Sequence, residues 1–212
     1  MLITHIGHAE FLLETQSGYS IVTDPFDKSC GYPIRNIRGD AVLVSHHHHD
    51  HDATGNVAGS PRIIDTAGLF SLETDVKVTA VEGDHDDAQG TKRGKTLLFR
   101  IDTEGLRIVH LGDLGCELSE EQVQVLKQPD ILMVPIGGFY TIDAEQAQKT
   151  AERLQARVII PMHYRTAYNS DWPIETEEAF LKLFDEKEIR RGGDALRVTA
   201  GDLSCQPHIV VI

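Results

Sequence analysis

One stretch of the sequence concentrates side chains that bind metal ions. Residues 45–52 read Ser-His-His-His-His-Asp-His-Asp, which places five imidazoles and two carboxylates in one short segment. Imidazole is the commonest metal ligand in proteins, and carboxylates complete such sites. A purification tag lies at a terminus, whereas this run is internal and follows the apolar residues 41–44. We interpret the stretch as a metal-binding segment; the alternative is a solvated polar loop without a metal.

The spacing within this stretch indicates which side chains can lie on one face. In an extended segment alternate side chains lie on one face, so His46, His48 and Asp50 can converge, and His51 follows as the chain turns. A register that began one residue later would place His51 where the pattern requires Asp. We expect the two intervening side chains to point away from the metals: His47 and His49.

Three further candidate ligands each follow an apolar segment that we expect to be a strand. His85 follows residues 76–81, Asp113 follows residues 106–110, and His163 follows residues 158–160. Ligand sites in sheet proteins gather where strands end. If these ends meet the histidine stretch at one edge, five imidazoles and two carboxylates converge. That set is large enough for two metals with a coordination position left for water, which is typical of catalytic sites.

The composition is ordinary for a soluble globular protein and argues against a nucleic-acid or membrane binder. The 212 residues suit one domain, which we expect to span residues 1–212. The net charge of −13 disfavours nucleic acid or an anionic membrane as a partner. Three widely spaced cysteines, Cys30, Cys116 and Cys205, favour a reducing compartment. With neither a leader nor a long apolar run, we expect a cytoplasmic protein; its oligomeric state stays open.

The remaining pattern places these candidate ligands on an α/β scaffold. Short apolar or β-branched runs punctuated by turn residues predict a β-rich first part, and strands then alternate with helices. We expect helices after the capping residues Ser119 and Asp143 and over residues 176–184, and an irregular loop after Asp24. Two mixed sheets packed together, with helices outside, would satisfy this order.

The ordered ligand set resembles that of the metallo-β-lactamase fold superfamily. Further stretches are similar to its small Zn-dependent hydrolase branch, which is related to the L-ascorbate-6-phosphate lactonases: Ile6-Gly7-His8-Ala9, Thr23-Asp24-Pro25-Phe26, His110-Leu111-Gly112-Asp113-Leu114-Gly115, Pro135-Ile136-Gly137-Gly138-Phe139-Tyr140-Thr141 and Pro161-Met162-His163-Tyr164. The similarity runs from about residue 1 to about residue 170. The resemblance implies an αββα four-layer sandwich with the site at one edge of two sheets.

The same resemblance implies a division of the ligands between two metals. One ion would be bound by His46, His48 and His85, and the second by Asp50, His51 and His163, with Asp113 bridging them. We expect Zn²⁺, two ions per chain, with iron or manganese as alternatives. The family places a Gly-His pair where His8 lies, which implies a supporting or substrate contact for His8. Position 116 is often His in this branch, whereas this chain has Cys116. Any role that the histidine has near the site is therefore in doubt here. The alternative is that Cys116 is itself a soft extra metal ligand.

The expected activity is hydrolysis of a small ester, lactone or phosphoester. A hydroxide shared by two zinc ions would attack the substrate, and the catalytic residues would be Asp50, which orients it and carries a proton, and His8. The partner would be a small molecule, with an anionic group as one option. Cations that could hold such a group, unless they form only solvated turns, are Lys92, Arg93, Lys95 and Arg165.

Other functions of the same superfamily remain alternatives. A di-iron redox enzyme typically has Glu in place of His48 and a fused flavin domain, and this chain has neither. A phosphodiesterase or nuclease usually carries basic segments, which the charge of −13 disfavours. A non-catalytic metal binder is a further alternative. Fold and metals do not name the reaction, so the substrate is not determined at this level.

Overall fold

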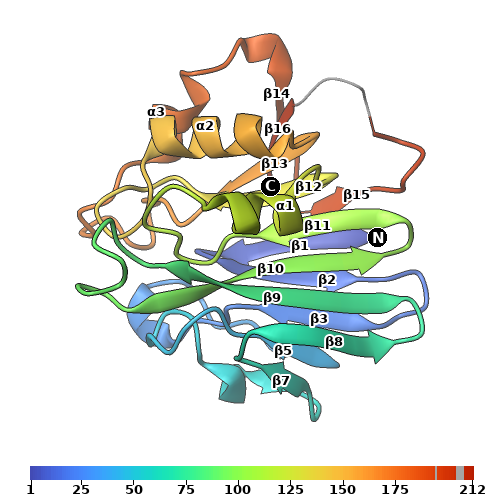
Figure 1. Ribbon diagram of the computed structural model, residues 1–212. Helices are drawn as coiled ribbons and strands as arrows, with labels where there is room; N and C mark the ends of the chain where they lie inside the picture. Colours follow the sequence, from blue (N-terminus) through green and yellow to red (C-terminus); the bar gives the residue numbers. More distant parts are fainter. Residues whose placement is uncertain (194, 204–207) are drawn as a thin grey trace.

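Two mixed β-sheets pack face to face in the computed structural model, which describes residues 1–193, 195–203 and 208–212 (Figure 1). The six-stranded sheet has the order β15 (Ala195–Arg197), β1 (Leu2–Gly7), β2 (Glu10–Glu14), β3 (Ser20–Thr23), β5 (Ala41–Leu43) and β7 (Arg62–Ile64). The eight-stranded sheet has the order β14 (Ile189–Arg191), β16 (His208–Val211), β13 (Val158–Met162), β12 (Ile131–Pro135), β11 (Leu106–His110), β10 (Lys95–Thr103), β9 (Val76–Asp84) and β8 (Gly68–Glu73). The expected fold of mixed sheets with flanking helices is confirmed. Cys205 lies outside the described residues.

Alternation along the strands builds the core between the sheets. Ile3, Phe11 and Leu13 from the six-stranded sheet belong to one buried cluster with Phe99 and Ile101 from the eight-stranded sheet. Side chains of a strand point alternately to its two faces, so the residues between them lie on the outer faces. Burying this apolar surface drives the two sheets together.

Helices cover the outer face of the eight-stranded sheet (Figure 1). They are α1 (Glu120–Leu126), α2 (Ala144–Leu154) and α3 (Glu177–Leu181). Ser119 and Asp143 form capping boxes at the starts of α1 and α2, as predicted. The predicted extent of the third helix, residues 176–184, was too long. After Leu181 the backbone bonds Leu183 N–H to Phe180 and Phe184 N–H to Leu181, a tighter turn that ends the α-helix.

Turns and a short ribbon cover the outer face of the six-stranded sheet. The ribbon pairs β4 (Ile37–Arg38) with β6 (Val57–Ala58), and the 3₁₀ turns are η1 (Lys28–Cys30) and η2 (Thr54–Asn56). Phe26, Cys30 and Tyr32 pack there against the sheet. The loop that we expected to be irregular therefore holds a short strand and a 3₁₀ turn. A third such turn is η3 (Glu186–Glu188). None of the helices in the described residues has the length and apolarity needed to cross a bilayer.

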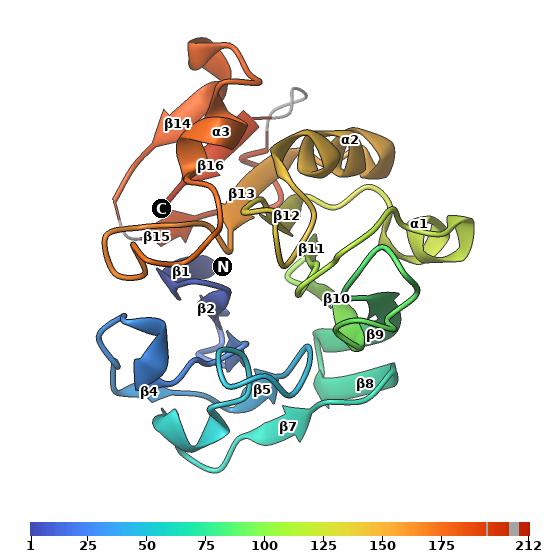
Figure 2. The same cartoon turned by 90° about the vertical axis from the view of Figure 1, so that its left-hand side faces the viewer.

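Strand direction brings the candidate ligands to one edge. In the eight-stranded sheet β11, β12 and β13 run parallel, and β9 shares their direction because β10 is antiparallel to both β9 and β11. In the other sheet β1, β3 and β5 share one direction by the same reasoning. The arrowhead of β1 points left in Figure 1, and that side faces the viewer in Figure 2. The carboxyl ends of these strands, and the residues that follow them, lie at that edge.

Candidate metal centre

Three histidines form the first ligand group. His46 follows β5, His48 lies two residues further on, and His85 follows β9 of the opposite sheet. Their ring nitrogens lie within 4.8 Å of one another. The His46 Nε2 to His48 Nδ1 distance is 2.9 Å. His46 and His85 are buried, whereas His48 is exposed, so the group opens toward solvent on the His48 side.

The second group combines three histidines with one carboxylate. His8 follows β1, His163 follows β13, and Asp50 and His51 come from the histidine stretch. The Asp50 Oδ2 atom lies 3.2 Å from His8 Nε2 and 3.5 Å from His51 Nε2. The three imidazoles are almost fully buried. His8 was expected to have a supporting or substrate role, and the structure places its ring beside Asp50, His51 and His163.

Asp113 lies between the two groups and contacts both. Its Oδ1 is 3.3 Å from His51 Nε2, and its Oδ2 is 3.1 Å from His163 Nε2. The same Oδ2 lies 3.4 Å from His85 Nε2 and 3.9 Å from His46 Nε2. A single buried carboxylate thus faces ligands from both sheets, which is the position that a bridging ligand requires. The seven predicted ligands all belong to this one cluster.

Unsatisfied atoms in the cluster test whether its residues suit a metal ion. His51 Nε2 and Asp113 Oδ1 are both buried and lie 3.3 Å apart, yet neither forms a hydrogen bond of regular geometry with a described residue. A buried polar atom without a partner costs about 1–3 kcal/mol, so native proteins rarely leave two of them side by side. A cation bound to both atoms removes this cost, and imidazole with carboxylate is a donor set suited to Zn²⁺. The residues present therefore fit the metals that the resemblance implies.

The electrostatics of His46, His8 and Asp113 favour the protonation states that bind metals. At His51, by contrast, burial acts to lower the pKa, but Asp113 and Asp24 outweigh it and hold the pKa of that ring well above its usual value. Burial lowers the pKa of His46 to about 3 and that of His8 to about 4, which leaves both rings neutral near pH 7. For Asp113, burial acts to raise the pKa, but His163 and His51 outweigh it, and the pKa lies well below its usual range. A neutral imidazole and an ionised carboxylate are the forms that coordinate a cation.

Asp24 orients His51, a role that was not predicted. Its carboxylate lies 3.0 Å from His51 Nδ1 and accepts hydrogen bonds from the Ser45 backbone N–H and hydroxyl, each at 2.7 Å. A carboxylate behind a ligating histidine sets the tautomer and aims the other nitrogen at the metal. Asp24 is fully buried at the end of β3. The signal in the sequence was its position at a strand end, where the other ligands also lie.

Backbone strain marks the same strand ends. His8, Asp24 and His163 have φ values of +53°, +39° and +53°, a region that residues other than glycine rarely adopt. The His163 N–H donates to the His8 carbonyl over 3.0 Å, which joins the ends of β1 and β13 from opposite sheets. Such strain persists where the surrounding structure requires it, and it clusters at functional sites.

Two glycines let the Asp113 loop approach its neighbours. A Cβ atom on Gly112 would lie 2.6 Å from Thr96 Oγ1 and 2.7 Å from the Leu97 carbonyl oxygen, and Gly112 has φ +48°. A Cβ atom on Gly115 would lie 2.3 Å from the His85 carbonyl carbon. Glycine is therefore required on both sides of Asp113 for this close backbone packing.

Three further histidines divide between surface, core and cavity wall. His47 is exposed and lies 3.5 Å from Asp52, as expected for a side chain that points away. His49 is also exposed and belongs to neither ligand group of the cluster, but it lines the cavity beside them and contacts Ser29. His110 is buried, with Nε2 3.0 Å from the Ala9 carbonyl oxygen and Nδ1 accepting from Gly112 N–H.

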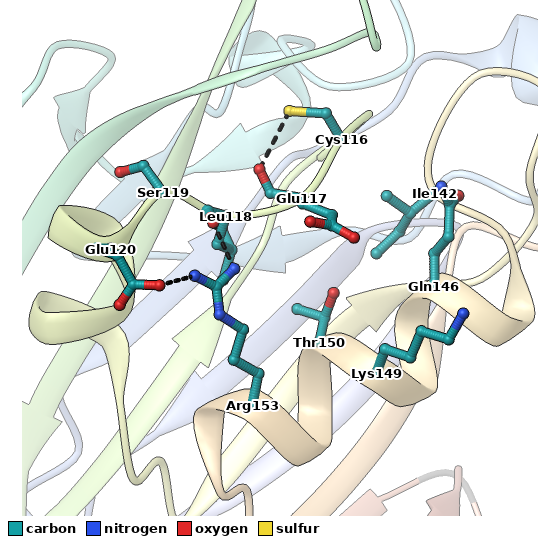
Figure 3. A pocket seen from close by; sticks show the side chains of 10 residues that line it. All are labelled: Cys116, Glu117, Leu118, Ser119, Glu120, Ile142, Gln146, Lys149, Thr150 and Arg153. Atoms are coloured by element: carbon teal, nitrogen blue, oxygen red, sulfur yellow. Dashed lines mark hydrogen bonds and ion pairs between the residues drawn. The ribbon is translucent and has the colours of Figure 1, made fainter.

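Cys116 lies in a different cavity from the histidines. That cavity, of about 440 Å³, lies between the loop after Asp113 and the helices α1 and α2 (Figure 3). The Cys116 thiol donates weakly to the Glu117 carbonyl oxygen over 3.5 Å. Elsewhere in the lining of this cavity, Arg153 pairs with Glu120. The structure does not bring Cys116 to the metal ligands, so it offers no support for a role as an extra ligand.

A cavity of about 580 Å³ opens in front of the metal ligands. Its walls are formed by His48, Asp50, His85, Asp113 and His163 together with Ser29, His49, Arg93, Tyr140 and Trp172. Of the four cations considered from the sequence, only Arg93 lines it. Lys92 pairs with Asp87 and Lys95 with Asp84, while Arg165 lines a separate cavity.

Comparison with known proteins defines the class. A family model described as the beta-lactamase superfamily domain matches residues 2–163. A metal-dependent hydrolase of Methanosphaera stadtmanae is 32% identical over 199 residues, 78% of this chain and 85% of that protein. One of Archaeoglobus fulgidus is 31% identical over 196 residues, 78% of this chain and 84% of that protein. A crystal structure of a proposed Zn-dependent hydrolase of the metallo-β-lactamase superfamily from Thermotoga maritima is 40% identical, covers 99% of this chain and 97% of that chain, and has a TM-score of 0.83.

The two sheets, the flanking helices and the ligand cluster at one edge thus define a metallohydrolase-type α/β sandwich. The chain belongs to the beta-lactamase superfamily. The prediction of a metal-dependent hydrolase of this superfamily is confirmed at that level of description. The narrower relation to the ascorbate-6-phosphate lactonases stays a prediction.

Proposed function

We propose that this chain hydrolyses a small ester, lactone or phosphoester with two zinc ions held at the strand ends. One ion would be held by His46, His48 and His85, and the other by Asp50, His51 and His163, with Asp113 shared. The observation that carries the proposal is the pair of buried atoms His51 Nε2 and Asp113 Oδ1, which face each other over 3.3 Å and lack a regular hydrogen bond. The chemistry that such ions supply is a hydroxide nucleophile near neutral pH and polarisation of the bond that breaks.

The protein's own contribution is to hold the carboxylate of Asp50 in the cavity. His8 Nε2–H donates to Asp50 Oδ2 over 3.2 Å, and burial keeps His8 in place. Asp50 lines the cavity, so its carboxylate can orient the attacking water and carry the proton to the leaving group. His8 then acts as a positioning residue, while Asp50 is the catalytic one.

Elemental analysis and a substrate panel test the proposal together. Lactones, thioesters and phosphodiesters are assayed with zinc-loaded protein, with and without a chelator, and with iron- and manganese-loaded protein. We expect two equivalents of zinc and a chelator-sensitive hydrolysis of at least one ester or lactone. Asp50→Asn should lower kcat by about 10²–10⁴-fold, and Asp52→Asn, on the same loop, is the control. An Asp50→Asn protein that binds both metals and keeps its full rate would remove Asp50 from the mechanism.

The same measurements separate the other candidate functions. Iron in place of zinc, together with redox activity, would favour the di-iron enzyme. Phosphodiester cleavage of RNA or DNA would favour the nuclease, although a protein with a net charge of −13 attracts the phosphate backbone of a nucleic acid poorly. Tight metal binding with no turnover of any substrate class would leave a non-catalytic metal binder. The cavity of about 580 Å³ beside the ligands suits a small molecule.

A further inference from the structure

Arg93 is a cation in the cavity wall, and none of the described acidic side chains pairs with it. Among the described residues its guanidinium forms no ion pair, whereas its neighbours Lys92 and Lys95 are paired with Asp87 and Asp84. Arg93 is half-buried, so its charge is partly removed from water. A partly buried charge without a partner is costly, and a bound anion would offset that cost.

Two aromatic rings, nearly perpendicular to each other, lie close to the guanidinium. The Arg93 guanidinium carbon lies 5.9 Å from the centre of the Phe139 ring and 5.7 Å from that of Tyr140. Stacking on aromatic faces leaves the donor edge of the guanidinium free for hydrogen bonds. This arrangement presents a planar fork of N–H donors, which matches carboxylate and phosphate oxygens.

The loop that carries Arg93 is built around one buried carboxylate. Asp86 accepts hydrogen bonds from the backbone N–H groups of Ala88, Gly90, Lys92 and Arg93, at 2.8–3.0 Å. Burial acts to raise the pKa of Asp86, but these four donors outweigh it and hold the pKa at about 2. Asp86 follows the candidate ligand His85 directly, so the loop ties the position of Arg93 to the metal cluster.

The wall beside Arg93 is aromatic. Tyr140 and Trp172 line the cavity, with their ring centres 6.3 Å apart, and Trp172 lies edge-on to His8 at 5.2 Å. Flat or apolar parts of a ligand pack well on such rings. From the metal ligands outward, the cavity thus offers a reaction centre, an aromatic wall and a single unpaired cation.

We infer that Arg93 is the specificity-determining residue of this site, and that the substrate carries a carboxylate or phosphate group on a flat or apolar body. The anionic group binds the Arg93 guanidinium, the body packs on Tyr140 and Trp172, and the bond to be hydrolysed lies at the histidine cluster. This inference rests on the proposed hydrolase function for the position of the reacting bond. The recognition of the anion by Arg93 does not depend on turnover.

A binding experiment on zinc-loaded protein tests the inference without activity. The probes are para-nitroacetanilide, which is neutral, and two anionic compounds, N-(4-nitrophenyl)succinamate and para-nitrobenzylphosphonate. Trp172 is the chain's single tryptophan, so quenching of its fluorescence by the nitroaromatic ring reports binding in this cavity. We expect an anionic probe to bind about 10- to 100-fold more tightly than the neutral one, the range for a hydrogen-bonded ion pair. The tighter of the two anions identifies the head group.

Variants assign the preference to Arg93. Arg93→Met should remove the preference, and Arg93→Lys should keep part of it, because the charge remains but the planar fork is lost. Lys92→Met is the matched control, because Lys92 is a cation on the same loop but its side chain does not line the cavity. An anion preference that survives in Arg93→Met, or that is absent from the wild type, would overturn the inference. A purely structural role of Arg93 would lower thermal stability and leave the preference unchanged, which also overturns it.

Turnover separates this inference from the proposed function. With mono-para-nitrophenyl succinate and para-nitrophenyl acetate as esters, Arg93→Met should raise the KM of the anionic ester about 10- to 100-fold and leave kcat within about 2-fold. Hydrolysis of both esters without a charge preference would refute the role of Arg93 and leave the hydrolase intact. Arg93-dependent anion binding without any hydrolysis would refute the hydrolase and leave the recognition intact.

Discussion

The carboxyl of Glu10 makes stability depend on pH in a way that can be measured. Glu10 lies on β2 and is 5% exposed, and it accepts a long hydrogen bond of 3.4 Å from the Phe26 N–H. Burial raises its pKa from 4.5 to about 8, with a smaller contribution from the nearby Asp24 carboxylate. The folded state therefore keeps a proton on Glu10 over a pH range in which the unfolded chain has lost it.

The sign and size of the effect follow from this difference. Between the two pKa values the folded state binds more protons, so the free energy of unfolding falls as the pH rises. Each pKa unit corresponds to about 1.4 kcal/mol, so the loss from about pH 5 to about pH 7.5 is roughly 3 kcal/mol. Glu10→Gln cannot ionise and should escape this loss. The variant should be more stable than the wild type at neutral pH, by an amount that grows with pH.

Urea unfolding of both proteins across this pH range checks the prediction. Both are treated with chelator, so that proton release by metal binding does not contribute. The free energy of unfolding of Glu10→Gln minus that of the wild type should widen by roughly 3 kcal/mol. Glu14→Gln, which removes a half-buried carboxyl from the same strand, is the reference. Parallel curves for Glu10→Gln and the wild type would refute the reasoning about burial.

Three further predictions concern the metal centre. Asp24→Asn should weaken zinc binding about 10- to 100-fold in a chelator competition, because His51 loses its orienting partner; equal affinities in this variant and in the Asp52→Asn control would contradict that role. Removing the metals should lower the melting temperature by about 10 °C in calorimetry, because binding to the folded state alone stabilises it; an unchanged melting temperature would speak against a buried site. Gly115→Ala should destabilise the fold by about 1–3 kcal/mol in urea unfolding, since its Cβ would lie 2.4 Å from the backbone nitrogen of Asp86. Gly55→Ala, where the added atom meets open space, is the control, and similar values for both would exclude steric conflict as the cause.

Local patterns in the sequence determined the ligand types and the scaffold class. The histidine stretch predicted ligands in one cluster, but the alternation assumed for an extended segment was wrong. Residues 45–51 form bends and turns, and Asp50 joins a different ligand group from His46 and His48. The capping residues Ser119 and Asp143 predicted two helix starts, since a cap acts within three residues. Apolar runs likewise predicted the strands, whose parallel directions place their ends at one edge.

Tertiary structure alone decided which distant residues meet these ligands. Asp24 lies behind His51, and His8 joins the second ligand group, because β1 and β3 run parallel to β5 within the six-stranded sheet. Among the candidate cations only Arg93 reaches the cavity, because the loop around Asp86 turns it inward. Such contacts depend on how two sheets pack and on how a loop closes, and neither leaves a periodic signal in the sequence.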